Sequence, residues 1–252
     1  MKMTDISMAG KLDFDPGQAA MGHKLTISEV LAEYLRMERG RLAPKTHARY
    51  TEVIVLFTQS LNGYAANSLS QFDRARFDKL FNAEGEQHRE FCDMFGPEHI
   101  LENVGEFLNY FMVSKVMAGA DTLRASGTVM KKLAKWLAEH DYVGTDDAAL
   151  TIAQGADAAR NLPAAEKLSA LLYDLTTGRH VPKDSDIEGR FSITKVEPGR
   201  IWLQDDDDGE DYGPILLTEQ ATKLCRVGWT ISGAVRKSGN RCVLVEAFQV
   251  YP

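Results

Sequence analysis

The spacing of apolar residues changes once along this chain, and the change constrains the fold more than any single motif does. Up to about residue 186 the apolar side chains recur every three or four residues, as on one face of a helix. From Ile187 onwards they alternate with polar side chains, as in a strand with one buried face. We therefore predict an α+β protein in which an N-terminal helical bundle precedes a small β domain.

The helical part is best defined between residues 26 and 57. Thr26 or Ser28 would cap a first amphipathic helix, Gly40 would end it, and Pro44 would open a second helix. Basic residues gather where the two helices meet: Arg36, Arg39, Arg41, Lys45 and Arg49. This local positive cluster is the best functional clue, because the chain as a whole has a formal net charge of -7.

Three more helices are predicted before residue 143. A helix inserted within residues 63–95 carries apolar side chains at helical spacing, namely Phe72, Phe77, Leu80 and Phe81. Pro97 begins the next helix, which has a broad apolar stripe: Ile100, Val104, Phe107, Leu108, Phe111 and Met112. The last helix has Trp136 on its apolar side with Val129, Leu133 and Leu137, so we interpret this tryptophan as a core anchor rather than a platform for a ligand.

The order of these motifs resembles a known domain. RLAPKTHARYTEVIVLFTQSL is similar to the second helix of the SAM-like core-binding domain of tyrosine recombinases and phage integrases, where an S/A-P-x-T-x-x-x-Y pattern precedes an apolar helix ending in Phe. FGPEHILENVGEFLNYFM resembles the third helix of that family, and DTLRASGTVMKKLAKWLAEHDYV resembles the fourth. The resemblance covers residues 26–143, although the segment at 63–95 is longer than the family's connector.

The resemblance implies that the basic second and fourth helices contact double-stranded DNA. The candidate residues are Arg39, Arg41, Lys45, Thr46, His47, Arg49, Arg124, Lys131, Lys132 and Lys135. Physical chemistry supports this independently, because lysine and arginine beside a helix N-terminus offer donors and positive potential to backbone phosphates without reading bases. The alternative is that these charged helix faces are merely solvated.

The catalytic half of a recombinase is missing from the sequence. Such an enzyme needs arginines, a lysine and a histidine around the phosphate, together with a tyrosine nucleophile. None of the six histidines begins the family's H-x-x-R motif, and Tyr251 is predicted to end a strand. We recognise no phosphate-cradling glycine loop or Ser-His-Asp arrangement either, so we predict a protein that is not an enzyme and needs no cofactor.

A domain boundary is predicted between residues 144 and 163, where the composition shifts to alanine and aspartate. We expect two linker helices there, at 146–160 and 163–175. The predicted divisions are a flexible arm (1–23), a core-binding helical domain (24–143), a helical linker (144–186) and a small β-barrel (187–252).

The barrel is predicted to have five strands, at 190–196, 200–204, 215–217, 229–236 and 241–250, with a short helix at 218–226. This order favours an OB-like barrel, with an SH3-like barrel as the alternative. Arg200 and Trp202 would face outward from the second strand if Ile201 and Leu203 point inward. Trp202 is therefore a candidate for stacking with nucleic-acid bases, or else for packing against the helical domain or a partner.

Other charged clusters do not predict metal sites. The acidic run at 205–211 fails the calcium-loop register, because Gln204 and Ile215 would occupy ligand positions, and we interpret it as a solvated hairpin loop. Two further pairs lack the third ligand of a zinc site and are interpreted as surface or capping groups: His88 with Glu90, and His99 with Glu102.

Composition and charge exclude several classes of protein. The three cysteines form no close pair, no apolar run is long enough to span a bilayer and the N-terminus lacks the order of a signal peptide, which indicates a cytoplasmic protein. The acidic balance excludes a general nucleic-acid coat protein, so any DNA binding must be local. We predict a non-catalytic DNA-binding accessory or regulatory protein. The alternatives are a protein-interaction adaptor that keeps the fold without binding DNA, and an enzyme with an unrecognised site.

Overall fold

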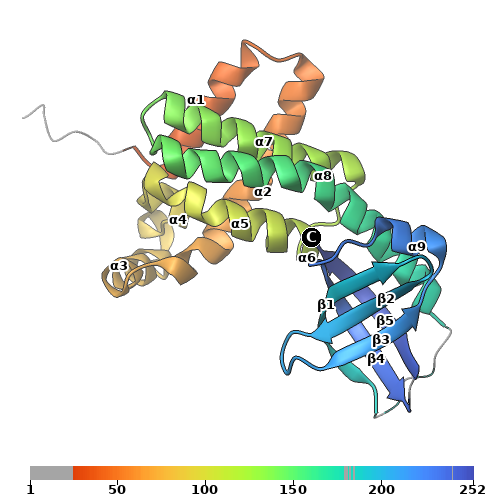
Figure 1. Ribbon diagram of the computed structural model, residues 1–252. Coiled ribbons are helices and arrows are strands. Elements are labelled where there is room, and N and C mark those ends of the chain that lie inside the picture. The colour runs from red at the N-terminus through yellow and green to blue at the C-terminus, as the bar shows by residue number, and fades with distance from the viewer. Residues whose placement is uncertain (1–24, 179–180, 182, 184, 240) are drawn as a thin grey trace, which may run out of the picture.

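The computed structural model describes residues 25–178, 181, 183, 185–239 and 241–252. A helical region is followed along the chain by a closed five-stranded β-barrel, which lies at one end of the helices (Figure 1). The predicted α+β order, with helices before strands, is confirmed. The predicted arm at residues 1–23 lies outside the described residues.

The helical region contains α1 (Ile27–Arg39), α2 (Pro44–Tyr64), α3 (Gln71–Phe81), α4 (Phe91–Met94), α5 (Val104–Glu106), α6 (Met112–Ser114), α7 (Ala120–Glu139) and α8 (Thr145–Thr176). Short 3-10 turns lie at Ala65–Ser68, Gly85–Gln87, Pro97–His99 and Leu101–Asn103, and a π turn lies at Phe107–Phe111. The barrel contains β1 (Ile187–Glu197), β2 (Arg200–Asp205), β3 (Asp211–Leu216), α9 (Glu219–Leu224), β4 (Thr230–Ser238) and β5 (Arg241–Tyr251).

Helices α1 and α2 form a hairpin that projects at the top of Figure 1. Thr26, rather than Ser28, caps α1: its hydroxyl accepts from the Glu29 N–H, and its own N–H donates to the Glu29 carboxylate at 2.8 Å. Ser28 instead donates to Asp93 Oδ1 at 2.6 Å. Pro44 opens α2, where its missing N–H leaves no helical hydrogen bond unmade.

The single helix predicted from Pro97 is broken into 3-10, α and π turns. Its apolar stripe is buried nonetheless, because the stripe faces several helices at once. The ring of Phe107 packs 5.1 Å from that of Phe57, while the ring of Phe111 lies 5.9 Å from that of Tyr64. A π turn adds a residue to the helical turn and so changes which side chains share a face. Periodicity alone predicts no such local change of helix type.

Helix α8 differs most from the prediction, which placed two helices at 146–160 and 163–175. It is one helix of 32 residues that continues through Pro163. Proline in a helix interior removes a hydrogen bond and costs roughly 3 kcal/mol. Packing on both sides offsets this cost, since Ala158 and Leu162 belong to the helical core whereas Ala165, Leu168 and Leu172 belong to the barrel core. The predicted linker therefore serves both cores.

The barrel strands follow the order β1-β2-β3-β5-β4 and close by pairing β1 with β4. Strands β3 and β5 are parallel, and α9 lies between β3 and β4, which is the OB-like arrangement rather than the SH3-like alternative. Strand β3 begins at Asp211, earlier than the predicted 215, because Tyr212 is buried in the barrel against Phe191, with ring centroids 5.8 Å apart.

Candidate nucleic-acid interface

The predicted DNA-binding residues lie on two separate parts of the helical region. One group, here called the hairpin tip, surrounds the turn between α1 and α2: Arg39, Arg41, Lys45, Thr46, His47 and Arg49. The other, here called the α7 face, lies on the exposed side of α7: Arg124, Lys131, Lys132 and Lys135. The structure brings each group together but keeps the two groups on different helices.

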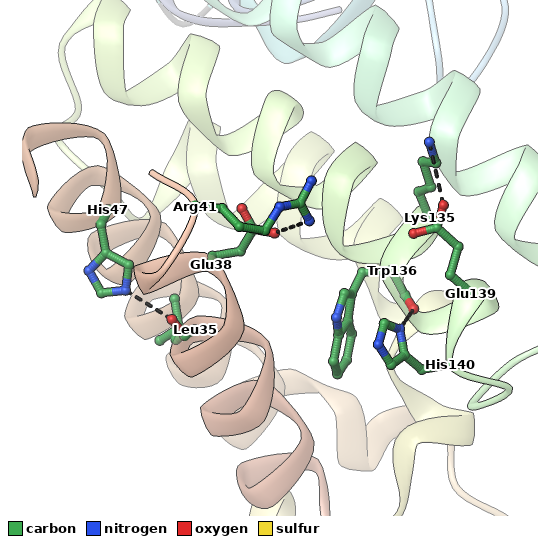
Figure 2. Close-up of polar contacts among 8 residues, drawn as sticks. All are labelled: Leu35, Glu38, Arg41, His47, Lys135, Trp136, Glu139 and His140. Atoms are coloured by element: carbon green, nitrogen blue, oxygen red, sulfur yellow. Dashed lines mark hydrogen bonds and ion pairs between the residues drawn. The ribbon is translucent and has the colours of Figure 1, made fainter. Parts of the chain in front are cut away.

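Two residues of the hairpin tip stabilise the turn itself. The Arg41 guanidinium lies 3.1 Å from Glu38 Oε1, and this exposed arginine neutralises a carboxylate that is almost buried. The His47 ring forms a 3.0 Å hydrogen bond with the Leu35 carbonyl, so it joins α2 to α1 (Figure 2). Both side chains therefore have a structural role in holding the hairpin.

Arg49 is held in a network that joins α2 to α7. Its guanidinium donates to Thr122 Oγ1 at 2.5 Å and to Glu52 Oε2 at 2.9 Å, while Thr122 donates to Glu52 at 3.3 Å. The positive charge of Arg49 is thus balanced locally, and its side chain is only partly exposed. Arg49 therefore connects α2 to α7, and its guanidinium is not free to bind a phosphate.

The α7 face is an exposed surface. Residues three, four or seven apart on a helix share a face, and Arg124, Lys131 and Lys135 follow this spacing along the exposed side of α7. Arg124 lies 3.2 Å from Asp121, and Lys135 lies 3.4 Å from Glu139. Both ion pairs are exposed, and such pairs contribute only about 0–1 kcal/mol each to stability. Arg124 and Lys135 can therefore leave these carboxylates for another anion at little cost.

Among the predicted lysines and arginines, four form no ion pair with any residue that the structure describes: Arg39, Lys45, Lys131 and Lys132. All four side chains are exposed. Two of them are at the hairpin tip and two are on the α7 face, so each surface keeps cations that a phosphate could reach.

Trp136 lies between the two basic surfaces as a core anchor. It is 3% exposed, stacks on His140 at 4.5 Å and packs against Tyr34 at 5.4 Å. Figure 2 shows His47 and Lys135 on opposite sides of the view, with Trp136 between them. In the described chain, the Tyr34 hydroxyl and Trp136 Nε1 are buried without a hydrogen-bond partner, and burial raises the pKa of Tyr34 far above its ordinary value. These two groups belong to the core rather than to a binding surface.

Trp202 faces outward from β2 as predicted, while Ile201 and Leu203 are fully buried in the barrel. The Lys195 ammonium lies 4.4 Å from the centre of the Trp202 ring. On another side Gly213 lies so close that a β-carbon there would fall 2.5 Å from Trp202 Cδ1. A base that stacked on the ring from the side of Lys195 would first have to displace this lysine.

Lys195 is a barrel residue that the sequence did not single out. A β-bulge between Ile193 and Lys195 shifts the register, so that Lys195 rather than Thr194 pairs with Trp202. Lys195 also lies 2.8 Å from Glu197, which lies 2.9 Å from the outward-facing Arg200. The only signal in the sequence would have been the interrupted alternation of β1, which does not reveal the partner.

The acidic run at 205–211 spans the turn between β2 and β3. The predicted solvated loop is wrong for Asp205, which is buried as the last residue of β2, and Asp211 already belongs to β3. Asp205 Oδ1 accepts from the Asp207 N–H at 2.8 Å, and the Glu210 carboxylate pairs with Lys237, which lowers the pKa of Glu210 below its ordinary value. Two histidines have local partners, as the interpretation of surface or capping groups requires: His88 bonds the Phe81 carbonyl and His99 bonds Glu102. Among the described residues, no group of three or more histidine, cysteine, aspartate or glutamate side chains could hold a metal ion.

No helix in the described ranges is both long and apolar enough to cross a bilayer. Comparison of the chain with protein-family models, with curated proteins and with solved structures finds no match. The likeness to the recombinase core-binding domain therefore rests on the sequence motifs alone.

Proposed function

We propose that this protein is a non-catalytic accessory or regulatory protein that binds duplex DNA through its phosphates, with the α7 face as the principal contact. One observation carries the proposal. Lys131 and Lys132 are exposed, and neither forms an ion pair with another described residue. They lie on α7 together with Arg124 and Lys135, so the four cations form one stripe. The chain as a whole carries a formal net charge of -7. A cationic stripe on an acidic protein directs a polyanion to that stripe and away from the remaining surface.

The geometry of the stripe suits a phosphate backbone. Arg124 and Lys135 are separated by eleven positions, which corresponds to roughly 16 Å along a helix. Duplex DNA carries one negative charge per about 1.7 Å of its axis, so a stripe of this length can contact several phosphates. Asp121 and Glu139 would release their arginine and lysine at little cost, because both pairs are exposed.

The hairpin tip supplies the second contact in this proposal. Arg39 and Lys45 are exposed and form no ion pair with described residues, whereas His47 and Arg49 are occupied by Leu35 and by Thr122. The tip also projects beyond the helices behind it, where a duplex could reach it (Figure 1). Replacing Arg49 with glutamate would break its hydrogen bonds to Thr122 and Glu52 and so destabilise the fold. Binding is therefore tested with substitutions at Arg39 and Lys45.

The test is fluorescence anisotropy with a labelled random-sequence duplex at low and physiological salt. Lys131→Glu with Lys132→Glu should weaken binding strongly and lower the slope of log affinity against log salt by about 2, since each phosphate contact contributes about 0.9. Arg39→Glu with Lys45→Glu should weaken binding to a smaller extent. The matched control is Arg76→Glu with Lys79→Glu on α3, which changes net charge equally at the other end of the helical region.

Two results would contradict the proposal. One is the absence of binding to any duplex at low salt. The other is an equal loss of binding in the α3 control, because the effect would then follow from net charge rather than from the α7 face.

The second candidate function is a protein-interaction adaptor that keeps the helical fold without binding DNA. It is favoured by the fact that five of the ten predicted contact residues are already bonded within the chain: Arg41, His47, Arg49, Arg124 and Lys135. An apolar protein interface would persist at salt concentrations that abolish phosphate contacts. Retained partner binding at high salt, without duplex binding at low salt, would therefore favour the adaptor.

A further inference from the structure

A groove of about 540 Å³ lies where the helical region meets the barrel. Its walls come from three segments of the chain: residues 113–118, which include the end of α6, one face of α8, and the end of β5. We call it the junction groove. Its size falls within the range of about 300–1,000 Å³ typical of ligand sites, so it can take several side chains of a partner.

The walls of the junction groove are held by hydrogen bonds between the helices and β5. Ser169 Oγ on α8 accepts from the Val250 N–H at 2.9 Å, and Gln249 Nε2 donates to the Val113 carbonyl at 3.0 Å. A groove that is already formed requires little ordering when it is filled, which favours binding.

Large apolar side chains line the groove and face solvent. Met117 is fully exposed, Tyr173 is 53% exposed and Phe248 is 51% exposed. An isolated exposed apolar residue is ordinary, but three from different elements in one concave site mark an interaction surface. Methionine and aromatic residues are also the types enriched at protein interfaces.

The charged residues that line the groove are both acidic. Glu166 and Asp174 lie eight positions apart on α8, on the same face, and neither forms an ion pair with another described residue. Lys115 does not line the groove, and its ammonium lies 5.3 Å from the centre of the Tyr110 ring, which is outside the groove. The groove therefore favours an occupant that is apolar and positively charged, and it disfavours nucleic acid.

We propose that the junction groove binds an amphipathic, basic helix of a partner protein. The apolar face of that helix would contact Met117, Tyr173 and Phe248, and its lysines or arginines would pair with Glu166 and Asp174. This site is separate from the α7 face, so the protein would join a DNA-bound state to a protein partner through two different surfaces.

The test uses a labelled peptide of leucine and lysine designed as an amphipathic helix, and a twin in which glutamate replaces lysine. The full-length protein should bind the lysine peptide and not the twin. Met117→Ser with Tyr173→Ser should weaken binding about tenfold or more, and so should Glu166→Lys with Asp174→Lys. These side chains are exposed, so melting curves should show that the variants still fold.

Matched controls separate the groove from general effects. Phe72→Ser with Val227→Ser removes exposed apolar side chains elsewhere, and Glu84→Lys with Glu86→Lys changes net charge equally elsewhere; both should keep peptide binding. Equal weakening in these controls, or equal binding of the two peptides, would overturn the proposal. Self-association in sedimentation experiments that Met117→Ser with Tyr173→Ser abolishes would also overturn it, because the occupant would then be a second copy of this chain.

Discussion

Gly127 on α7 and Gly155 on α8 face each other where the two helices cross. A β-carbon on Gly127 would lie 2.5 Å from the Gly155 carbonyl oxygen, and one on Gly155 would lie 2.7 Å from the Gly127 carbonyl oxygen. Both distances are far shorter than any van der Waals contact, so each position requires glycine. This crossing positions α8, which carries the barrel at its other end, against the helix that carries the α7 face.

Gly155→Ala should destabilise the protein by about 1–3 kcal/mol through overpacking, although alanine is the better helix former. Gly63→Ala is the matched control, because a β-carbon at that position would meet no atom within 4 Å, and it should stabilise α2 by roughly 0.5–1 kcal/mol. Urea denaturation measures both. If both variants changed the free energy of unfolding in the same direction, the close crossing of α7 and α8 would be contradicted.

Ser169→Ala should cost about 1–3 kcal/mol, because it leaves the buried Val250 N–H without an acceptor. Amide hydrogen exchange at Val250 should accelerate along with the loss in unfolding free energy. The exposed Ser68→Ala removes only a hydroxyl that donates within its own turn, and its effect should stay within about 0.5 kcal/mol. Unchanged exchange at Val250 would show that the hydroxyl is not its acceptor.

Asp186 should contribute stability that depends on pH. Two hydrogen bonds from Arg236, at 2.5 and 2.7 Å, lower the pKa of this carboxyl from 3.8 to about 2. A carboxyl with a lowered folded-state pKa stabilises the fold above its unfolded value, and that contribution disappears as pH falls from about 4 towards 2. Asp186→Asn should therefore flatten the acid limb of the stability curve, as measured by denaturation at several pH values, whereas the exposed Glu84→Gln should not.

Trp202 should bind single-stranded DNA independently of the α7 face if bases stack on its ring. Trp202→Leu should then weaken binding of an oligothymidylate by about 1–3 kcal/mol and leave duplex binding unchanged. Lys195→Ala tests the same surface, since it removes the ammonium that lies over the ring. Anisotropy with the two labelled DNAs measures the effects. Equal affinity of wild-type protein and Trp202→Leu for the oligonucleotide would leave Trp202 as a packing residue.

The residues of the predicted site lie on two surfaces of the helical region rather than on one. Helical spacing correctly placed Lys131 and Lys135 on an exposed face, because exposure follows the apolar pattern of α7. It could not show that Arg49 is engaged by Thr122, which lies 73 positions away in the chain. In the barrel, the alternation of residues in β1 did not predict that Lys195 lies beside Trp202, because a β-bulge shifts the register of that strand.

The sequence by itself determined the features that depend on neighbouring residues: a cap at Thr26 or Ser28, the start of α2 at Pro44, and the inward face of β2 at Ile201 and Leu203. Tertiary structure decided the continuity of α8 through Pro163, the separation of the two basic surfaces and the formation of the junction groove. The physical reason is the distance along the chain over which each interaction acts. Caps, turns and alternation act within a few residues, whereas packing on two cores and contacts between distant segments exist only after the chain has folded.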